Sequence, residues 1–401
     1  MPGKTPALLA AAVAALALAA TAAGGTTPGV SANEILIGGT VPLSGEAAAA
    51  ANIARGAAAY FAYTNAHGGV YGRTIDYEYL DDGYDPNQTV QDVRKLVQSD
   101  GVFAVFGSVG TSENLAVRDF LNQSQVPQLF ANSGATAFGA DHAKYPWTIG
   151  YLPTYRAEGE IYARYIATNL PRARVGVLYQ DDSYGNDLLN GFERGLGAKR
   201  SLIVSTQGYD PTATDVQAQI AALKGSGANV LCIFAFGKFS IQAFNYAGQL
   251  GWTPQIFVND VSAAAPLMRL APARTAAGAI SIVYLKDPAS PAWRKDPGIA
   301  LYRQILARYG KGIPPGDGYA IAGMASAFTL VDALQHAGRN LTRAGVMKAA
   351  ASLNEANNPF LLPGIVVRTT PKYRFPVSQV QLQRWTKGHW QLFGGLLPAR
   401  P

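Results

Sequence analysis

The stretch that decides the fold is residues 102–112, which read VFAVFGSVGTS. The run of apolar residues at its start predicts a buried strand, and Gly107 ends it. A helix is expected to follow at 112–122, and a further strand at 126–130. A strand, a helix and a strand joined by short connections are typical of a parallel sheet covered by helices.

The same alternation extends in both directions along the chain. Before residue 102, the Ala-rich segment 46–65 predicts a helix, and Pro86 marks the first turn of another. A second series of strands and helices begins at Tyr155, and two series predict two α/β lobes with a cleft between them. The expected strands lie at 35–40, 74–80, 174–179, 202–205, 230–236 and 255–258, and the expected helices of the second series at 155–169, 184–196, 215–224 and 239–250.

The pattern weakens after Asp287, where prolines such as Pro297 interrupt it. We expect helices at 319–337 and 341–353 in this part, and strands at 365–367 and 380–385. These elements are too few for a third lobe. We therefore expect them to complete the first two lobes, which requires the chain to cross between the lobes more than once.

The N-terminal residues are typical of a secretory signal peptide. Lys4 precedes an apolar stretch at 7–20, and small residues follow at 21–25. A membrane anchor is the alternative, but the stretch is shorter than the ~20 apolar residues needed to span a bilayer. We expect a signal peptide at 1–23 and a soluble, periplasmic mature protein. We expect no lipid anchor, because the apolar stretch is not followed by a cysteine that could become the mature N-terminus.

Composition excludes several classes of protein. The chain has 401 residues, 48% of them hydrophobic, and a formal net charge of +7 without any basic run, so a nucleic-acid-binding surface is not indicated. A single cysteine excludes an internal disulfide and a Cys-rich zinc site. Cys232 lies in an apolar run, which predicts a buried, inert thiol.

The sequence lacks the usual signatures of catalysis. No Gly-x-Ser-x-Gly elbow or phosphate-binding P-loop is present, and the four histidines are too isolated to share a metal ion. Asp81 and Asp82 could form a carboxylate pair that binds a metal ion or acts in general acid–base catalysis. Because they end a strand and lead into a turn, we interpret them as turn and capping residues. We therefore predict no enzymatic activity, no cofactor and no metal.

Groups suited to binding lie at the expected strand ends of the first lobe. Thr111 and Ser112 stand between a strand and a helix, where a helix N-terminus favours an anion. Ser133, Gly134 and Thr136 follow the next strand with the same chemistry. For Thr111 and Ser112, the alternative is an ordinary Ser/Thr helix cap. Because two neighbouring strand ends both carry small, hydroxyl-bearing residues, we favour a site for a carboxylate.

The second lobe supplies different groups. Tyr184 and Phe236 would cover the ligand's apolar body, and Asp260 would receive an ammonium in a dry cleft. An exposed turn carboxylate is the alternative for Asp260. Lys238 could meet an acidic group, or be a solvated lysine.

Several stretches, in order and spacing, resemble one known family. The sequence is similar to the solute-binding proteins of ABC importers, specifically the leucine/isoleucine/valine-binding family with the type I periplasmic binding fold. The similarity covers nearly the whole mature chain. The matching stretches are 37–45, 65–73, 81–86, 107–111, 126–130, 134–136 and 184–185.

The resemblance implies two Rossmann-like lobes that close on a ligand like a hinged clamp. The lobes would comprise 31–148 plus 284–364 and 149–283 plus 365–398, with a three-stranded hinge near 147–151, 282–285 and 364–367. By the same resemblance, ligand-carboxylate contacts fall on Thr111, on backbone around Gly134 and on Thr136. The family's cleft tyrosine falls on Tyr184, a second aromatic position on Phe236, and the carboxylate for the amino group on Asp260.

Two departures keep the ligand open between a hydrophobic amino acid and an aromatic acid. The aromatic residue that often follows the first Ser-Gly in the family is replaced by alanines at 47–51, and Phe236 has no hydroxyl. The resemblance implies a monomer that delivers a small carboxylate to ABC permease subunits in the inner membrane. The alternatives are a sensor coupled to a receptor and a secreted α/β hydrolase, which would require a Ser–His pair in the cleft.

Overall fold

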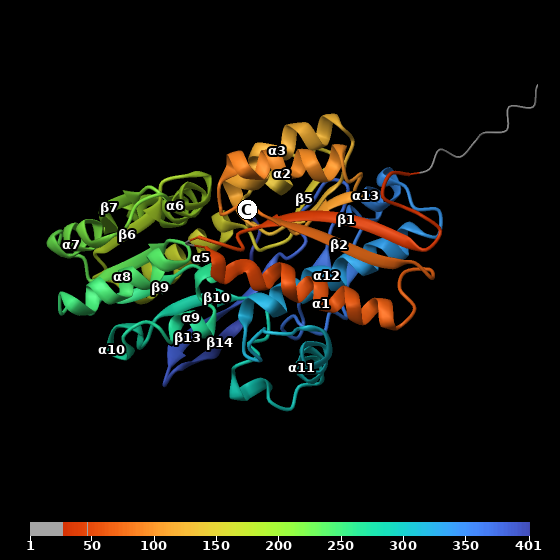
Figure 1. Cartoon of the computed structure of the whole chain (residues 1–401). Helices are drawn as coiled ribbons and strands as arrows, with labels where there is room; N and C mark the ends of the chain where they lie inside the picture. The colour runs from red at the N-terminus through yellow and green to blue at the C-terminus, as the bar shows by residue number, and fades with distance from the viewer. Residues whose placement is uncertain (1–26, 46) are drawn as a thin grey trace, which may run out of the picture.

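The computed structural model describes residues 27–45 and 47–401 and contains two separate α/β lobes side by side (Figure 1). Each lobe has its own main sheet with helices on both faces. The expected two-lobed α/β architecture is therefore confirmed. The predicted signal peptide, and Glu46 at the start of the first expected helix, lie outside the described residues.

The first sheet is wholly parallel, with the strand order β2-β1-β3-β4-β5. Successive side chains of a strand point to opposite faces, so Phe106 joins the core beneath α1 and α12 while Val105 joins the core beneath α2 and α3. Burial of both faces explains why the central strand β3 is apolar throughout. The elements are β1 (Glu34–Val41), η1 (Ala48–Ala50), α1 (Ala51–Ala66), β2 (Thr74–Asp81), α2 (Pro86–Gln98), β3 (Ala104–Phe106), α3 (Thr111–Gln123), β4 (Gln128–Ala131), α4 (Ala137–Ala140) and β5 (Thr148–Gly150).

The second sheet has the order β14-β13-β10-β9-β8-β6-β7, and its late strands β13 and β14 form an antiparallel hairpin on β10. Helices α5 and α6 cover one face, and α7 and α8 cover the other. Cys232, on β8, is fully buried, as the sequence indicated. The elements are α5 (Tyr155–Asn169), β6 (Val175–Gln180), α6 (Ser183–Leu196), η2 (Gly197–Leu202), β7 (Ile203–Tyr209), α7 (Gln217–Gly225), β8 (Val230–Phe234), α8 (Lys238–Gln249), β9 (Gln255–Val258), η3 (Asp260–Ser262), α9 (Ala265–Met268), α10 (Ala273–Ala276), β10 (Ile280–Val283), β13 (Gln379–Thr386) and β14 (His389–Pro398).

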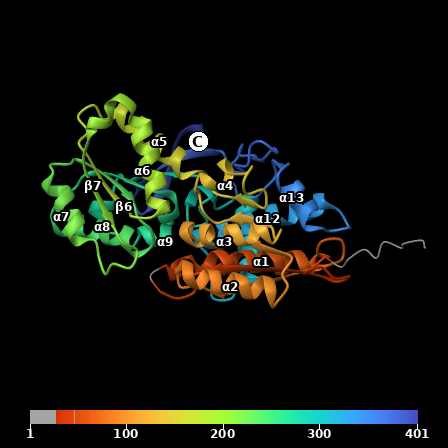
Figure 2. The same cartoon turned by 90° about the horizontal axis from the view of Figure 1, so that it is seen from above.

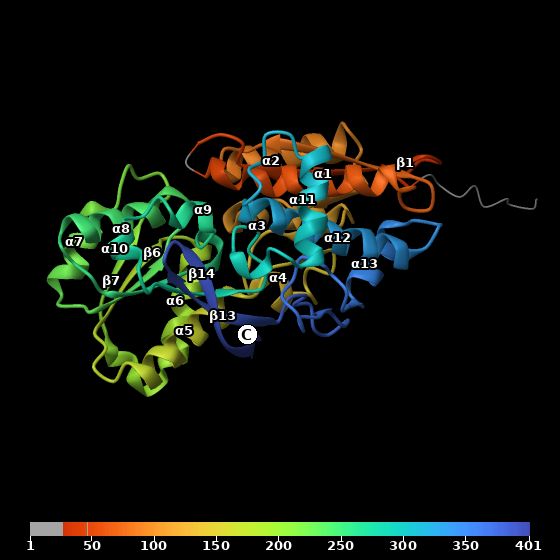
Figure 3. The ribbon, with the colours of Figure 1, turned by 90° about the horizontal axis from the view of Figure 1, so that it is seen from below.

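The late part of the chain completes both lobes, as expected. Helix α12 packs against α1 and α13 packs against α12, whereas the hairpin of β13 and β14 lies at the edge of the second sheet, in blue beside the green strands in Figure 3. The remaining elements of this part are η4 (Pro291–Trp293), α11 (Pro297–Tyr309), α12 (Gly318–Ala337), α13 (Arg343–Ala350), β11 (Asn354–Glu355) and β12 (Val367–Arg368).

Helix α11 corrects the interpretation of the prolines. Pro297 is not an interruption but the first residue of α11, and Asp296 caps that helix by accepting from the amide of Ile299. A proline is tolerated there because the first helical amides have no partner within the helix. Strands β5 and β10 fall at the expected hinge segments 147–151 and 282–285, whereas β14 is absent from the sequence prediction.

The chain passes between the two main sheets three times. The passages are 151–154 after β5, 284–290 after β10 and 369–378 after β12. The third passage lies later than the expected 364–367, because β12 first pairs with β11, placing Val367 opposite Glu355. The exact lobe boundaries stay a prediction.

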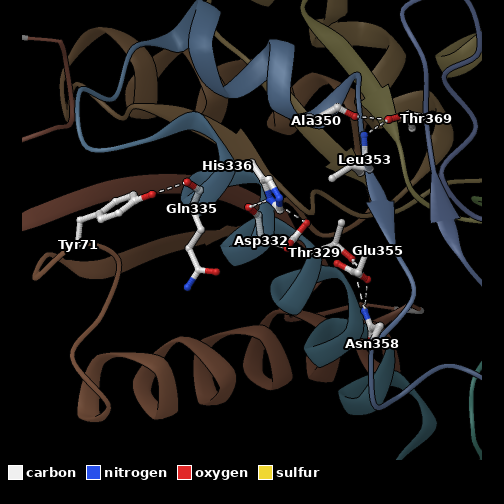
Figure 4. A network of polar contacts seen from close by, with 10 residues as sticks. All are labelled: Tyr71, Thr329, Asp332, Gln335, His336, Ala350, Leu353, Glu355, Asn358 and Thr369. Carbon is white, nitrogen blue, oxygen red and sulfur yellow. Dashed lines mark hydrogen bonds and ion pairs between the residues drawn. The ribbon is translucent and has the colours of Figure 1, made fainter.

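Buried polar contacts hold two of these passages to the first lobe, and Figure 4 shows those of Glu355 and Thr369. Glu355 accepts hydrogen bonds from Thr329 on α12, at 3.0 Å, and from Asn358, at 2.9 Å. Tyr151, in the first passage, also lies within 3.1 Å of the Thr329 hydroxyl. Thr369, at the start of the third passage, donates to the last residue of α13 at 2.7 Å. Both passages therefore begin on a fixed part of lobe 1.

No helix within 27–45 and 47–401 combines the length and the apolar character needed to cross a lipid bilayer.

Close packing of α1 on α12 depends on two glycines. A Cβ atom at Gly323 would overlap the backbone carbonyl of Ile53, and one at Gly56 would overlap that of Ala320. Neither obstacle is a side chain that can rotate away, so the two helix axes would have to separate. The packing of lobe 1 therefore requires a residue without a side chain at both positions.

We expect Gly323→Ala to lower the free energy of unfolding by about 1–3 kcal/mol, the usual cost of overpacking a core. Urea denaturation monitored by circular dichroism measures it. Gly225→Ala is the matched control, because Gly225 ends α7 and a Cβ atom added there would have no other atom within 4 Å. Equal stability of the two variants would show that α1 and α12 are not in close contact.

Candidate functional site

A cavity of about 110 Å³ lies between the two lobes. Its lining comes from the segments that follow the strands: Thr111 after β3, Asn132 after β4, Phe236 after β8, Asp260 after β9 and Tyr284 after β10. In parallel sheets, ligands bind at the carboxyl ends of the strands. The cavity is therefore at the position where this fold places a ligand.

The lobe 1 side of the cavity is the N-terminus of α3. Gly110 caps this helix with φ 106°, a conformation that a residue with a side chain rarely adopts, and Thr111 is its first residue. The Thr111 hydroxyl lies 2.7 Å from that of Ser133, which also accepts from the amide of Ala135 at 3.1 Å. Ser133 thus orients Thr111, which lines the cavity.

Three other sequence-predicted residues hold the lobes together instead of lining the cavity. The Ser112 hydroxyl donates to Asp182 at 3.2 Å, and the Thr136 amide donates to Asp187 at 2.8 Å. Both aspartates belong to the α6 region, which faces α3 across the lobe boundary (Figure 2). Gly134 packs against the first passage, where its carbonyl accepts from the amide of Tyr155 at 2.8 Å.

An aromatic wall covers the cavity. Tyr184 and Phe236, both predicted, line it, and so do four tyrosines that the sequence reasoning missed. Tyr84 of lobe 1 stacks on Phe236 of lobe 2 with ring centroids 5.3 Å apart, so this pair spans the cleft. The missed residues are Tyr84, Tyr155, Tyr284 and Tyr319.

These tyrosines carry little sequence signal because each lies at or near the end of an element. Tyr84 has φ 65°, just before the Asp85 cap of α2, and Tyr155 is the first residue of α5. The order of strands and helices along the chain could still have indicated these tyrosines, since every passage between the lobes must border the cleft. Aromatic residues in or next to the passages are therefore candidates.

Asp260 lies on the lobe 2 side and lines the cavity, so it is not the exposed turn carboxylate of the alternative interpretation. Its backbone amide donates to the carboxylate of Glu158 at 2.8 Å, and Tyr162 donates to the same oxygen at 2.7 Å. Burial raises the pKa of Asp260 to about 7. Burial, followed by the charge of Asp260, raises the pKa of Glu158 well above its usual value.

Among the described residues, the cavity has one lysine, which is already paired. Lys286 lines the cavity but lies 2.9 Å from Asp296 and donates to the carbonyl of Pro359 at 2.9 Å. Lys238, considered from the sequence as a partner for an acid, is the first residue of α8 and is not among the lining residues. The other charged lining residues are Asp260 and Asp287.

The residues considered for catalysis or metal binding have structural roles. Asp81 accepts from the amides of Leu43 and Gly83, and Asp82 accepts from that of Tyr84, so the interpretation as turn residues is confirmed. In the described part of the chain, no three histidine, cysteine or acidic side chains are grouped so that they could hold a metal ion.

Comparison with known proteins gives consistent matches. A family model described as "Periplasmic binding protein" matches residues 34–389. Leu/Ile/Val-binding protein homolog 2 of Brucella abortus is 30% identical over 213 residues, which is 51% of this chain and 54% of that protein. The match thus spans about half the length of this curated relative.

Solved structures share the fold along most of the chain. A branched-chain amino acid ABC transporter protein from Thermus thermophilus, with bound valine, superposes with a TM-score of 0.80 at 17% identity, covering 91% of this chain and 97% of that one. A fatty acid ABC transporter substrate-binding protein from Thermomonospora curvata gives 0.75 at 20% identity, covering 92% and 94%. At such identities the similarity shows the fold alone.

The buried carboxylate of Asp260 predicts a pH dependence of stability. Its pKa rises from 3.8 to about 7 on folding, so between these values the folded state binds more protons and stability falls as pH rises. Asp260→Asn should flatten this fall between about pH 4 and pH 7, also because it removes a charge that acts on Glu158. Melting temperatures of the unliganded protein measure the effect.

Asp76→Asn is the matched control, because Asp76 is exposed on β2 and carries the same charge. Parallel melting profiles for the wild type and Asp260→Asn would contradict the assignment of a strongly buried carboxylate.

Proposed function

Because the chain belongs to the periplasmic binding protein family, we propose that it is the extracytoplasmic solute-binding component of an ABC importer. It captures a small amphipathic carboxylate between its lobes and releases it unchanged. One observation carries the proposal: a cavity at the strand ends has hydroxyl and helix N-terminal groups on one side and an acidic, aromatic surface on the other.

The carboxylate end of the ligand binds at α3. A helix N-terminus presents unpaired amides and a partial positive charge, and both favour an anion. Thr111 adds a hydroxyl whose direction is fixed by Ser133. Within the described residues no arginine lines the cavity, and its lysine is neutralised by Asp296, so α3 is the site that best suits the carboxylate.

The other end of the ligand meets lobe 2. The rings of Tyr184, Phe236 and Tyr84 enclose an apolar body. Asp260 receives an ammonium if the ligand is an amino acid, and the cation restores the charged form that burial disfavours. The family relation and the valine bound to the Thermus thermophilus protein support this choice.

A carboxylate without an ammonium is the second candidate. The fatty acid ABC transporter protein from Thermomonospora curvata supports it, and so does the raised pKa of Asp260, which allows a neutral, protonated side chain near pH 7. An aromatic acid would use the same tyrosine-rich wall. The two candidates differ in whether they need the charge of Asp260.

Closure is the step that retains the ligand. Hydrogen bonds join the lobes directly from Ser112 to Asp182, from Thr136 to Asp187, and from the Tyr319 hydroxyl to the carbonyl of Val261 at 3.0 Å. These contacts break when the lobes separate about the three passages. Ligand binding then favours the closed state by bridging the same two surfaces.

A ligand screen tests the function. We expect a hydrophobic amino acid or an aromatic acid to raise the melting temperature, because a ligand that binds only the native state stabilises it. If the ligand is an amino acid, Asp260→Asn should weaken binding at least tenfold, whereas binding of an acid lacking an ammonium should survive. If no amino acid, and neither benzoate nor octanoate, raises the melting temperature, the proposed function is wrong.

Thr111→Ala tests the carboxylate site. Loss of one hydrogen bond to a charged group should cost about 1–2 kcal/mol, or about 5–30-fold in Kd. Isothermal titration calorimetry with the ligand found in the screen measures the change. Thr253→Ala, an exposed threonine, is the control and should bind as the wild type does. Unchanged affinity in Thr111→Ala would remove Thr111 from the site.

A further inference from the structure

One end of the cavity carries a carboxylate that the proposed function does not use. Asp287 follows β10 in the second passage and lines the cavity together with Leu285 and Pro288. One of its oxygens accepts from the amide of Ala289 at 2.8 Å. The other, Oδ2, is buried and has no hydrogen-bond partner among the described residues. A buried, unpartnered carboxylate oxygen is costly and requires an explanation.

The cationic side chains around Asp287 do not supply that partner. Lys286, the neighbouring residue, is paired with Asp296 and the carbonyl of Pro359. The charges of Arg269 and His389 act to lower the pKa of Asp287, yet burial outweighs them and the pKa is raised. Neither side chain forms an ion pair or a hydrogen bond with Asp287 in the described part of the chain.

A second cavity adjoins this end. It has about 460 Å³ of free space and shares four lining residues with the first, so these four form the wall between the two. Its other side chains include Trp293, Ser290 and His389. The four shared residues are Leu285, Asp287, Gln383 and Trp390. Asp287 therefore borders both cavities.

We propose that the ligand carries a second cationic group, joined to its amino acid end by an apolar chain, and that Asp287 Oδ2 receives this group at the hinge end of the cavity. The inference rests on the proposed function, since it needs the first ammonium at Asp260 and the carboxylate at α3. The ligand class is that of the α,ω-diamino acids and their guanidino equivalents. The same cavity offers apolar surface from Ile282, Ala322 and Tyr319 for the connecting chain.

The charges of the cavity agree with such a ligand. Two aspartates and one already neutralised lysine line it within the described part of the chain. A neutral amino acid would pair with Asp260 and leave Oδ2 of Asp287 buried without a partner. A dibasic amino acid satisfies both, and the aromatic rings around it favour cations further.

The test compares L-lysine with L-2-aminoheptanoate, which has a methyl group in place of the terminal ammonium. Calorimetric titration of the full chain should give a Kd at least tenfold lower for L-lysine. Titrations with L-ornithine and L-arginine then show which length best reaches Asp287. Equal affinity for L-lysine and L-2-aminoheptanoate would overturn the inference, and this comparison needs no variant.

Asp287→Asn should bring the ratio of the two Kd values close to one, because it removes the charge while keeping an oxygen for the amide of Ala289. Asp76→Asn, on the distant strand β2, is the control and should keep the ratio. A ratio retained in Asp287→Asn would also overturn the inference.

The outcomes separate the two proposals. If L-2-aminoheptanoate binds and depends on Thr111 but L-lysine has no advantage, the second cationic site is wrong and the proposed function stands. If no amino acid, benzoate or octanoate binds, the proposed function is wrong and the second site is wrong with it.

Discussion

The parallel direction of neighbouring strands is the constraint on which the site depends. Parallel strands require a crossover between them, so all their carboxyl ends meet at one edge of the sheet. Lobe 1 brings the segments after β3 and β4 to such an edge, and lobe 2 brings those after β8, β9 and β10. Because the two edges border a single cavity, short loops from distant parts of the sequence become the walls of one site.

The two walls of the cleft differ in chemistry, and this difference determines the orientation of a bound ligand. The lobe 1 wall presents a helix N-terminus and the Thr111 hydroxyl beside Tyr84, whereas the lobe 2 wall combines Asp260 with aromatic rings. A bound molecule with an anionic and a cationic end can lie in only one orientation between them. The contacts of Ser112 and Thr136 with the α6 region join the lobes without lining the ligand cavity, so closure and recognition use different residues.

The sequence predicted the regular elements better than the cavity. Helix α5 was predicted at its observed bounds, and the strand ends carrying Thr111, Phe236 and Asp260 were recognised because apolar runs stop there. Helix α11 was missed, since Pro297 is compatible with either an interruption or a first helical turn until the Asp296 cap is seen. Ser112 and Thr136 were predicted to contact the ligand, but both contact the α6 region of the other lobe, which depends on how the lobes meet. Tyr84, Tyr155 and Asp287 lie at element ends or in passages, where no periodicity exists to mark them.

The three passages between the lobes also govern how the molecule is built. The sheet of lobe 1 ends at Gly150, but α12 packs on it and on α1, and α11 packs on α1. The sheet begun by β6 is completed only by β13 and β14. Each core therefore needs residues from the late part of the chain before it is complete. A molecule cut before Gln379 would lack two strands of one lobe and keep an exposed sheet edge on β10, which is a template for aggregation. Molecules truncated late in the chain should consequently be degraded by proteases as readily as molecules truncated early.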